Sequence, residues 1–233
     1  MDKVLIIGGN SMIGKALADK WSNQNFEVHS TSRRFLNSNQ IFFDLQSPNF
    51  SVFSDQYECI VFLAGDTNIQ SCINNPILSE KVNVINTILA LDFFESISSN
   101  IIFISTADVF FGSTPRESVN SPPKPKNLYG HQKALVERHI INNTANTAIL
   151  RLSKVIRPEF NLFAEWRNAI SQKQKIYPYI DKYFSPTNLA SVIEKICYIK
   201  SNNDTKIHHC SGEDDISYFD YALHYLDGNQ TLI

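Results

Sequence analysis

Short apolar runs alternate with longer amphipathic stretches along the first two thirds of the chain. The apolar runs have the length of buried strands and occupy residues 3–7, 26–31, 40–43, 59–64, 100–105 and 147–152. Helix-forming stretches follow several of them, at residues 15–21, 76–96 and from 129 onward. Because one parallel strand reaches the next through a crossover, usually a helix, this alternation predicts a doubly wound parallel α/β sheet. We expect it to comprise residues 1–155, followed by a small C-terminal region at 156–233.

A glycine-containing turn follows the first apolar run. Gly8 and Gly14 bound a segment that leads into a helix-forming stretch, and Ser11, Met12 and Ile13 lie between them. Glycine permits a tight turn and a close approach of backbone to a pyrophosphate, and the helix N-terminus behind it offers free N–H groups. Ser11 stands where the usual pattern has its middle glycine. The context predicts a dinucleotide-binding loop, with a plain turn between strand and helix as the alternative.

Tyr129 and Lys133 lie four residues apart in a helix-forming stretch, so both side chains project from the same helical face. A phenol normally ionises near pH 10, and a neighbouring ammonium favours its phenolate form. The pair is therefore a candidate general acid and base. Such a spacing also arises by chance in a chain with 9 tyrosines, so the pair gains its weight from the glycine loop upstream.

The composition is that of one globular unit, or of one domain with a small appendage. The 233 residues are 43% hydrophobic and 19% charged, with a net charge of -2. This balance does not point to nucleic acid or a membrane surface as partner. We expect no N-terminal signal, because the first apolar run begins at residue 3, and no apolar run approaches the ~20 residues that span a bilayer. A cytoplasmic location is the resulting expectation.

The cysteines and histidines show no metal-binding pattern. The 4 cysteines are scattered without the paired spacing of a zinc site, so we expect reduced thiols, at Cys59, Cys72, Cys197 and Cys210. The 6 histidines do not form a ligand pattern either, and we expect no metal.

Several motifs occur in an order that is typical of one enzyme family. After the glycine loop come Asp44 with Leu45, Ala64 with Gly65, and Asn83 in the next helix-forming stretch. From residue 3 to about residue 225, the chain resembles the extended short-chain dehydrogenase/reductase family of nucleotide-sugar enzymes. The resemblance is strongest to the dTDP-4-dehydrorhamnose reductase-like branch.

This resemblance implies a Rossmann fold and a cofactor site built from these motifs. Gly8, Ser11, Met12, Ile13 and Gly14 would form the cofactor loop, and Ala64 and Gly65 would lie beneath the cofactor. Asp44 would hold the adenine, with a simple turn aspartate as the alternative. For Asn83 the alternative is a buried amide that satisfies backbone groups.

The resemblance also implies a catalytic set. Thr106, at the end of an apolar run, would donate a hydrogen bond to a substrate oxygen, unless it only caps the strand end. Tyr129 would transfer a proton while hydride moves to or from the nicotinamide. Lys133 would lower the pKa of the phenol and hold the ribose. The tail at residues 183–187 resembles the entry to the family's substrate domain.

The residues after the second apolar run favour one cofactor over the other. NAD-binding sites of this type usually end that strand in Asp or Glu, which binds the ribose 2′-hydroxyl, whereas this chain has Arg33 and Arg34. Guanidinium groups pair with phosphate bidentately, so NADP is expected in preference to NAD. The alternative is that both arginines point into water.

The residues after Thr106 bear on the type of reaction. The dehydratases of the family carry acidic residues at two positions where this chain has Ala107 and Asp108, so only one acid remains. The resemblance then leaves a keto-sugar reductase or an epimerase, and the arginine pair favours the reductase, which consumes NADPH. Rivals of another class are a non-catalytic NADP-binding sensor or scaffold, and a structural partner that docks a larger enzyme.

The C-terminal region is short for a substrate domain of this family. A shortened domain would leave the pocket more exposed or require a neighbouring chain to close it, so a homo-oligomer is possible. Asn161, Phe163 and Trp166 are candidates for contact with a sugar or nucleotide, with helix core as an equal alternative.

Overall fold

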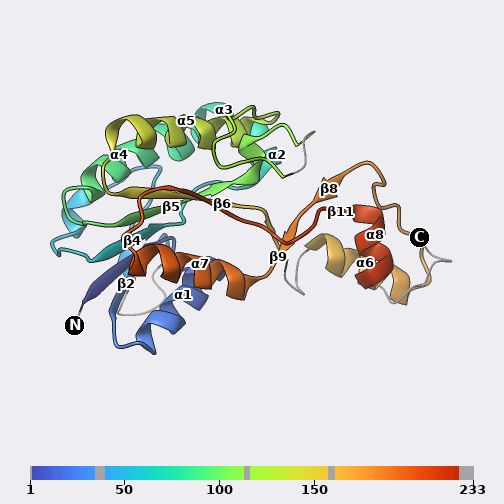
Figure 1. Ribbon diagram of the computed structural model, residues 1–233, viewed down its shortest axis with the longest axis horizontal. Coiled ribbons are helices and arrows are strands. Elements are labelled where there is room, and N and C mark those ends of the chain that lie inside the picture. Colours follow the sequence, from blue (N-terminus) through green and yellow to red (C-terminus); the bar gives the residue numbers. More distant parts are fainter. Residues whose placement is uncertain (1, 35–39, 113–115, 157–160, 226–233) are drawn as a thin grey trace. The chain divides into compact units, whose positions relative to one another are not determined.

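A computed structural model describes residues 2–34, 40–112, 116–156 and 161–225 (Figure 1). The chain packs as two compact units. The first contains Met1–Leu152 and Ile193–His209, and the second contains Ser153–Val192 and Cys210–Ile233. Residues 193–209, expected in the C-terminal region, therefore pack with the first unit. No helix among the described residues has the length and apolar character needed to cross a membrane.

A seven-stranded sheet forms the centre of the first unit, in the order β10-β6-β5-β4-β1-β2-β3. Its strands are β1 (Lys3–Ile7), β2 (Glu27–Ser32), β3 (Gln40–Phe42), β4 (Cys59–Phe62), β5 (Ile101–Thr106), β6 (Thr147–Leu152) and β10 (Ile207–Cys210). All pairings from β3 to β6 are parallel, with Leu5 opposite both His29 and Ile60. Strand order reverses between β1 and β4, the place where open α/β sheets bind their ligands. The predicted doubly wound fold is confirmed.

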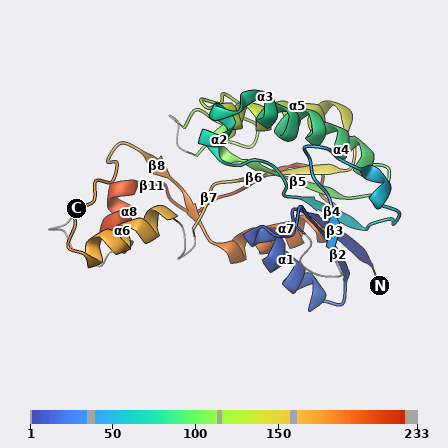
Figure 2. The ribbon, with the colours of Figure 1, turned by 180° about the vertical axis from the view of Figure 1, so that it is seen from behind.

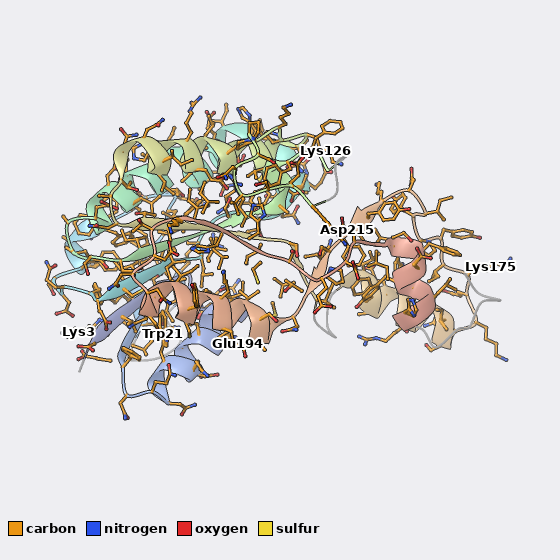
Figure 3. The ribbon with its side chains drawn as sticks, in the orientation of Figure 1. Lys3, Trp21, Lys126, Lys175, Glu194 and Asp215 are labelled. Atoms are coloured by element: carbon orange, nitrogen blue, oxygen red, sulfur yellow. The ribbon has the colours of Figure 1, made fainter. Side chains whose placement is uncertain are left out.

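Helices cover both faces of this sheet (Figures 1 and 2). On one face lie α1 (Met12–Ser22) and α7 (Leu189–Ser201). The other face carries α2 (Ile69–Asn74), α3 (Pro76–Glu80), α4 (Asn86–Phe94) and α5 (Leu128–Asn143). Because both faces are covered, the central strands β1, β4, β5 and β6 are buried almost throughout, as continuous apolar runs require. Side chains fill the space between the layers, and the Trp21 ring of α1 is 1% exposed (Figure 3).

The helix predicted over residues 76–96 differs from the expectation in its middle. Between α3 and α4 the chain forms a π-helical turn, Lys81–Ile85, which widens the helix and buries Asn83 and Val84. Phe94 of α4 then packs with Phe62 and Phe103 of the sheet in the main apolar core. Two short 3-10 turns complete the first unit, Phe50–Val52 and Ala107–Val109.

The second unit is small and built on aromatic packing. It contains α6 (Asn161–Ser171), α8 (Tyr218–Tyr225) and two short strand pairs, β7 (Lys154–Val155) with β9 (Pro186–Thr187) and β8 (Tyr183–Phe184) with β11 (Ile216–Ser217). Phe163 is fully buried and stacks on Tyr221 at 4.5 Å between ring centroids, and Trp166 is 7% exposed. Phe163 and Trp166 therefore belong to the helix core, which was the equal alternative to contact with a sugar or nucleotide. The side chain of Asn161 lies outside the described residues.

Candidate functional site

The glycine turn is pressed against the carboxyl end of β4. Gly8 has a φ of 93°, which favours glycine, and a Cβ there would lie 3.1 Å from the backbone nitrogen of Ala64. Its own N–H donates to Thr31 Oγ1 at 3.0 Å. Ser11 caps α1, because its hydroxyl accepts from the Gly14 N–H at 3.0 Å. With φ at -66°, position 11 needs no glycine, so the departure from the usual pattern has a local reason.

Polar side chains connect this turn to the end of β2. The Asn10 amide donates to Ser32 Oγ and accepts from Gln40 Nε2 at 3.0 Å. Ser32 Oγ in turn accepts from the Arg34 N–H at 2.8 Å. Arg33 and Arg34 follow this cluster, and both are exposed. Two guanidinium groups thus follow the strand end where we expect the ribose of a dinucleotide. The hydrogen bonds that join Asn10 to Ser32 and Gln40 were not indicated by the sequence.

Asp44 and Leu45 follow β3, and the Leu45 backbone is hydrogen-bonded to α4. Asp44 Oδ1 accepts from the Gln46 N–H at 2.9 Å, the geometry of the turn aspartate that was the alternative to an adenine contact. The Leu45 carbonyl accepts from the buried Asn86 amide of α4. This hydrogen bond fixes the segment where we expect the adenine, and no motif in the sequence indicated Asn86.

Asn83 sits in the π-helical turn and holds the segment after β4. Its Oδ1 accepts from the Asp66 N–H at 2.8 Å, and its Nδ2 donates to the Asp66 carbonyl at 2.9 Å. The same Nδ2 lies 2.8 Å from Gln132 Oε1 of α5, and Gln132 Nε2 donates to Ser79 Oγ at 2.8 Å. Asn83 therefore satisfies backbone groups next to Gly65, which was the alternative to a direct role in the cofactor site. Gln132, buried between Asn83 and Ser79, was missed from the sequence.

The start of α5 packs closely on the segment after β5. Asn127 caps the helix by accepting from the Gly130 N–H at 2.7 Å. Any side chain at Gly130 would overlap the Asp108 carbonyl oxygen, so only glycine permits this approach. The contact brings the first turn of α5, which carries Tyr129, against the segment that follows Thr106. Thr106 Oγ1 accepts from the Asp108 N–H at 3.2 Å and so caps the strand end.

Lys133 is buried on the sheet side of α5. Its ammonium donates to the Ile104 carbonyl at 2.9 Å and lies 4.4 Å from the centre of the Phe103 ring. Burial lowers the pKa of Lys133 from 10.5 to about 8, and the Glu137 carboxylate opposes this shift. At pH 7 the side chain therefore carries its charge inside the protein.

Tyr129 is 8% exposed, and its pKa lies above the ordinary value of 10. Burial is the main cause, and Asp108, Cys72 and Asp66 raise the pKa further. Lys133 is not among the groups that shift it, so the expectation that Lys133 lowers this pKa is not met by the protein alone. A phenol that stays protonated at pH 7 is a proton donor before it is a base.

Three of the four cysteines, Cys59, Cys72 and Cys210, are buried, and all four are free thiols. Within the described parts of the chain, the side chains of His, Cys, Asp and Glu do not gather in any group of three or more that could hold a metal ion.

Comparison with known proteins identifies relatives across the whole chain. Residues 2–231 match the family described as the RmlD substrate binding domain. The spore coat polysaccharide biosynthesis protein SpsK of Bacillus subtilis (strain 168) is 25% identical over 224 residues, which cover 95% of this chain and 77% of that protein. The methionine adenosyltransferase 2 subunit beta of Bos taurus is 25% identical over 155 residues, 64% of this chain and 46% of that protein.

A solved structure shares the fold. The dTDP-4-dehydrorhamnose reductase (rfbD) from Bacillus anthracis str. Ames, in complex with NADP, aligns with a TM-score of 0.82 at 20% identity, covering 97% of this chain and 81% of that one. Together with the family match, this confirms the resemblance inferred from the motifs. The chain belongs to the RmlD substrate-binding-domain family, whose members are NAD(P)-dependent oxidoreductases of the extended short-chain dehydrogenase/reductase type.

Proposed function

We propose that this protein reduces a keto group on a nucleotide-linked deoxysugar with NADPH. The observation that carries the proposal is the start of α5, where a buried, protonated Tyr129 lies one helical turn before a buried, charged Lys133. Gly130 holds this turn against the segment after Thr106. A proton donor, a cation and a hydroxyl thus gather at the carboxyl end of the sheet, where ligands of this fold bind.

The side chains of this site would protonate and hold the carbonyl oxygen while hydride is added to the carbonyl carbon. Bound NADPH supplies a hydride to the carbonyl carbon. The Tyr129 hydroxyl gives its proton to the carbonyl oxygen, so that the C=O bond becomes a CH–OH group and a phenolate remains. The Lys133 ammonium would hold the ribose hydroxyls of the bound cofactor. Thr106 Oγ1, released from the Asp108 N–H, would donate a hydrogen bond to the same carbonyl oxygen.

The cofactor would lie across the turn between β1 and α1. The turn from Gly8 to Gly14 and the N-terminus of α1 suit a pyrophosphate, and Arg33 and Arg34 suit a 2′-phosphate. The segments at Asp44 with Leu45 and at Ala64 with Gly65 would border the adenosine and nicotinamide halves, and Asn83 would hold the second segment in place. The NADP bound to the related Bacillus anthracis reductase supports this cofactor. We assign substrate binding to the second unit, Ser153–Val192 with Cys210–Ile233.

Turnover tests the proposal against its rivals. Purified protein, NADPH and a panel of 4-keto nucleotide sugars should give a loss of NADPH absorbance that matches the amount of reduced sugar. An epimerised sugar with no net oxidation of NADPH would favour the epimerase. Tight NADPH binding with no change in any sugar would favour a sensor or scaffold.

The cofactor preference is tested separately by dissociation constants. We expect NADPH to bind more tightly than NADH, and the double variant Arg33→Ala with Arg34→Ala to lose most of that preference while NADH affinity stays nearly unchanged. Equal affinities for the two cofactors in the unmodified protein would refute the role of the arginines.

A further inference from the structure

A buried ion pair lies behind the candidate catalytic residues. Glu137 of α5 is fully buried and Arg151 of β6 is 3% exposed. Arg151 Nη2 lies 2.7 Å from Glu137 Oε2, and Arg151 Nε lies 3.0 Å from Glu137 Oε1. Removing two charges from water is unfavourable, and replacing such a pair by apolar residues is often neutral or stabilising. Stability alone is therefore a weak reason for this pair to be present.

The pair connects α5 and β6 to three further parts of the first unit. Glu137 Oε1 accepts a hydrogen bond from Ser105 Oγ, the residue directly before Thr106 on β5. Arg151 Nη1 donates to the Val119 carbonyl at 3.1 Å, in the loop that leads toward α5. The same Nη1 lies 3.2 Å from His209 Nε2 of β10. Burial and the Arg151 charge lower the pKa of His209, so its ring is neutral at pH 7 and accepts this hydrogen bond.

The same carboxylate also faces Lys133. Glu137 lies four residues after Lys133 on α5, so the two side chains share the face that packs on β5. Glu137 is the charged group that acts on the Lys133 ammonium, whereas the acidic groups Asp108, Asp66 and Cys72, on the segments packed against α5, act on Tyr129. One carboxylate therefore contacts the residue beside Thr106 and favours the charge of Lys133.

We propose that Glu137 and Arg151 are positioning residues for the reduction: Ser105 and Arg151 hold the Glu137 carboxylate on the face of α5 that carries Lys133, where it fixes the end of β5 beside Thr106. This inference rests on the proposed function, because it concerns the same site. If the pair were purely structural, its removal would lower Tm, and any change in the titration of Lys133 would follow that loss of stability. The two roles are separable because Glu137 shares the helical face of Lys133 and its carboxylate raises the pKa of that lysine, an effect that depends on charge and not on stability.

Three variants separate charge from stability. Glu137→Gln removes the charge and leaves Arg151 buried without its carboxylate, so Tm should fall. Glu137→Gln combined with Arg151→Met makes the pair neutral, so much of the lost stability should return. Glu137→Asp keeps a carboxylate with a shorter side chain, and its Tm should also fall. Glu58→Gln is the matched control, because it breaks an ion pair of 2.7 Å with Lys200 elsewhere in the same unit.

We expect the pH at which kcat falls on the alkaline side of the profile, the alkaline limb, to depend on the charge at position 137. Activity requires charged Lys133, so the pH profile of kcat for keto-sugar reduction should fall as Lys133 loses its proton near pH 8. Without the Glu137 carboxylate this limb should move to lower pH, by about half a pH unit or more, in Glu137→Gln and in the neutral double variant. It should stay in place in Glu137→Asp and in Glu58→Gln, whatever their Tm.

Two further measurements keep this test independent of the proposed reaction. The pH dependence of NADPH affinity reports the same titration without substrate. The unfolding free energy of each variant, with and without Lys133→Met, reports it without any ligand. If wild type oxidises no NADPH with any keto sugar, the proposed function fails while these two readouts still decide the role of Glu137. A Lys133 titration that is unchanged in Glu137→Gln, or that shifts in step with Tm in all four variants, would overturn the inference.

Discussion

Lys133→Met should make the protein more stable at pH 7 while it removes a residue of the candidate site. Burial lowers the pKa of Lys133 from 10.5 to about 8, and this difference corresponds to about 3 kcal/mol of destabilisation of the folded state when the side chain is charged. Methionine keeps an unbranched chain beside the Phe103 ring and carries no charge. The lost hydrogen bond to the Ile104 carbonyl offsets part of the gain, so we expect a net increase of about 1–2 kcal/mol in the unfolding free energy.

The pH dependence gives the sharper measurement. Below pH 8 the lysine is protonated in both states, so the advantage of the variant is complete. Between about pH 8 and pH 10.5 the unfolded chain binds this proton and the folded protein does not, so wild-type stability rises with pH relative to the variant. Urea unfolding at a series of pH values, with a reducing agent present, should show the unfolding free energy of the variant minus that of wild type falling by about 3 kcal/mol across that window, so that wild type is the more stable protein at its upper end.

Parallel pH profiles for the two proteins would refute this reasoning, because they would mean that the ammonium is not held in a buried site. Lys200→Met is the matched control. Lys200 is also largely buried, but it forms an ion pair of 2.7 Å with Glu58. Because the Glu58 carboxylate is 42% exposed, losing this pair should change the unfolding free energy at pH 7 by only about 0–1 kcal/mol, without the gain expected for Lys133→Met.

Three further substitutions test the site. Tyr129→Phe should reduce turnover on the order of 10²-fold or more, with NADPH affinity nearly unchanged, and full activity would exclude Tyr129 as the proton donor. Gly130→Ala, which places a Cβ against the Asp108 carbonyl, should lower the unfolding free energy by about 1–3 kcal/mol in urea titrations and slow turnover, and an unaltered protein would contradict the close packing there. Asn83→Leu, which leaves the Asp66 N–H and carbonyl without partners, should cost about 3 kcal/mol on the same scale, and a loss below about 1 kcal/mol would show that water replaces the amide.

The sequence predicted the parts of the fold that depend on periodic burial. Strands such as Lys3–Ile7 and Thr147–Leu152 were found because helices cover both of their faces, which leaves continuous apolar runs in the chain. The helix over residues 76–96 was predicted without its π turn, because a one-residue widening leaves hydrophobic spacing nearly unchanged.

Contacts between distant polar residues could not be predicted in the same way. Gln132 meets Asn83 across 49 positions, and Arg151 meets His209 across 58. Nothing local to an amide or a guanidinium in the sequence specifies a partner that only the fold brings near. Tyr129 and Lys133 were recognised because their relation lies within a single helical turn, whereas the effect of burial on the Tyr129 pKa depends on the surrounding layers.

The interleaved order of the two units has a consequence for biosynthesis. Residues 153–192 of the second unit leave the ribosome before β10 and most of α7, which belong to the first unit. Until residue 209 has emerged, β6 pairs with β5 alone and its other edge stays open, although all six of its residues are buried in the finished protein. One face of the nascent sheet likewise lacks Ile196 and Ile199, which α7 buries completely. The first unit therefore completes its fold only after the intervening segment of the second unit has been synthesised, and its unfinished sheet is the surface most exposed to aggregation in the meantime.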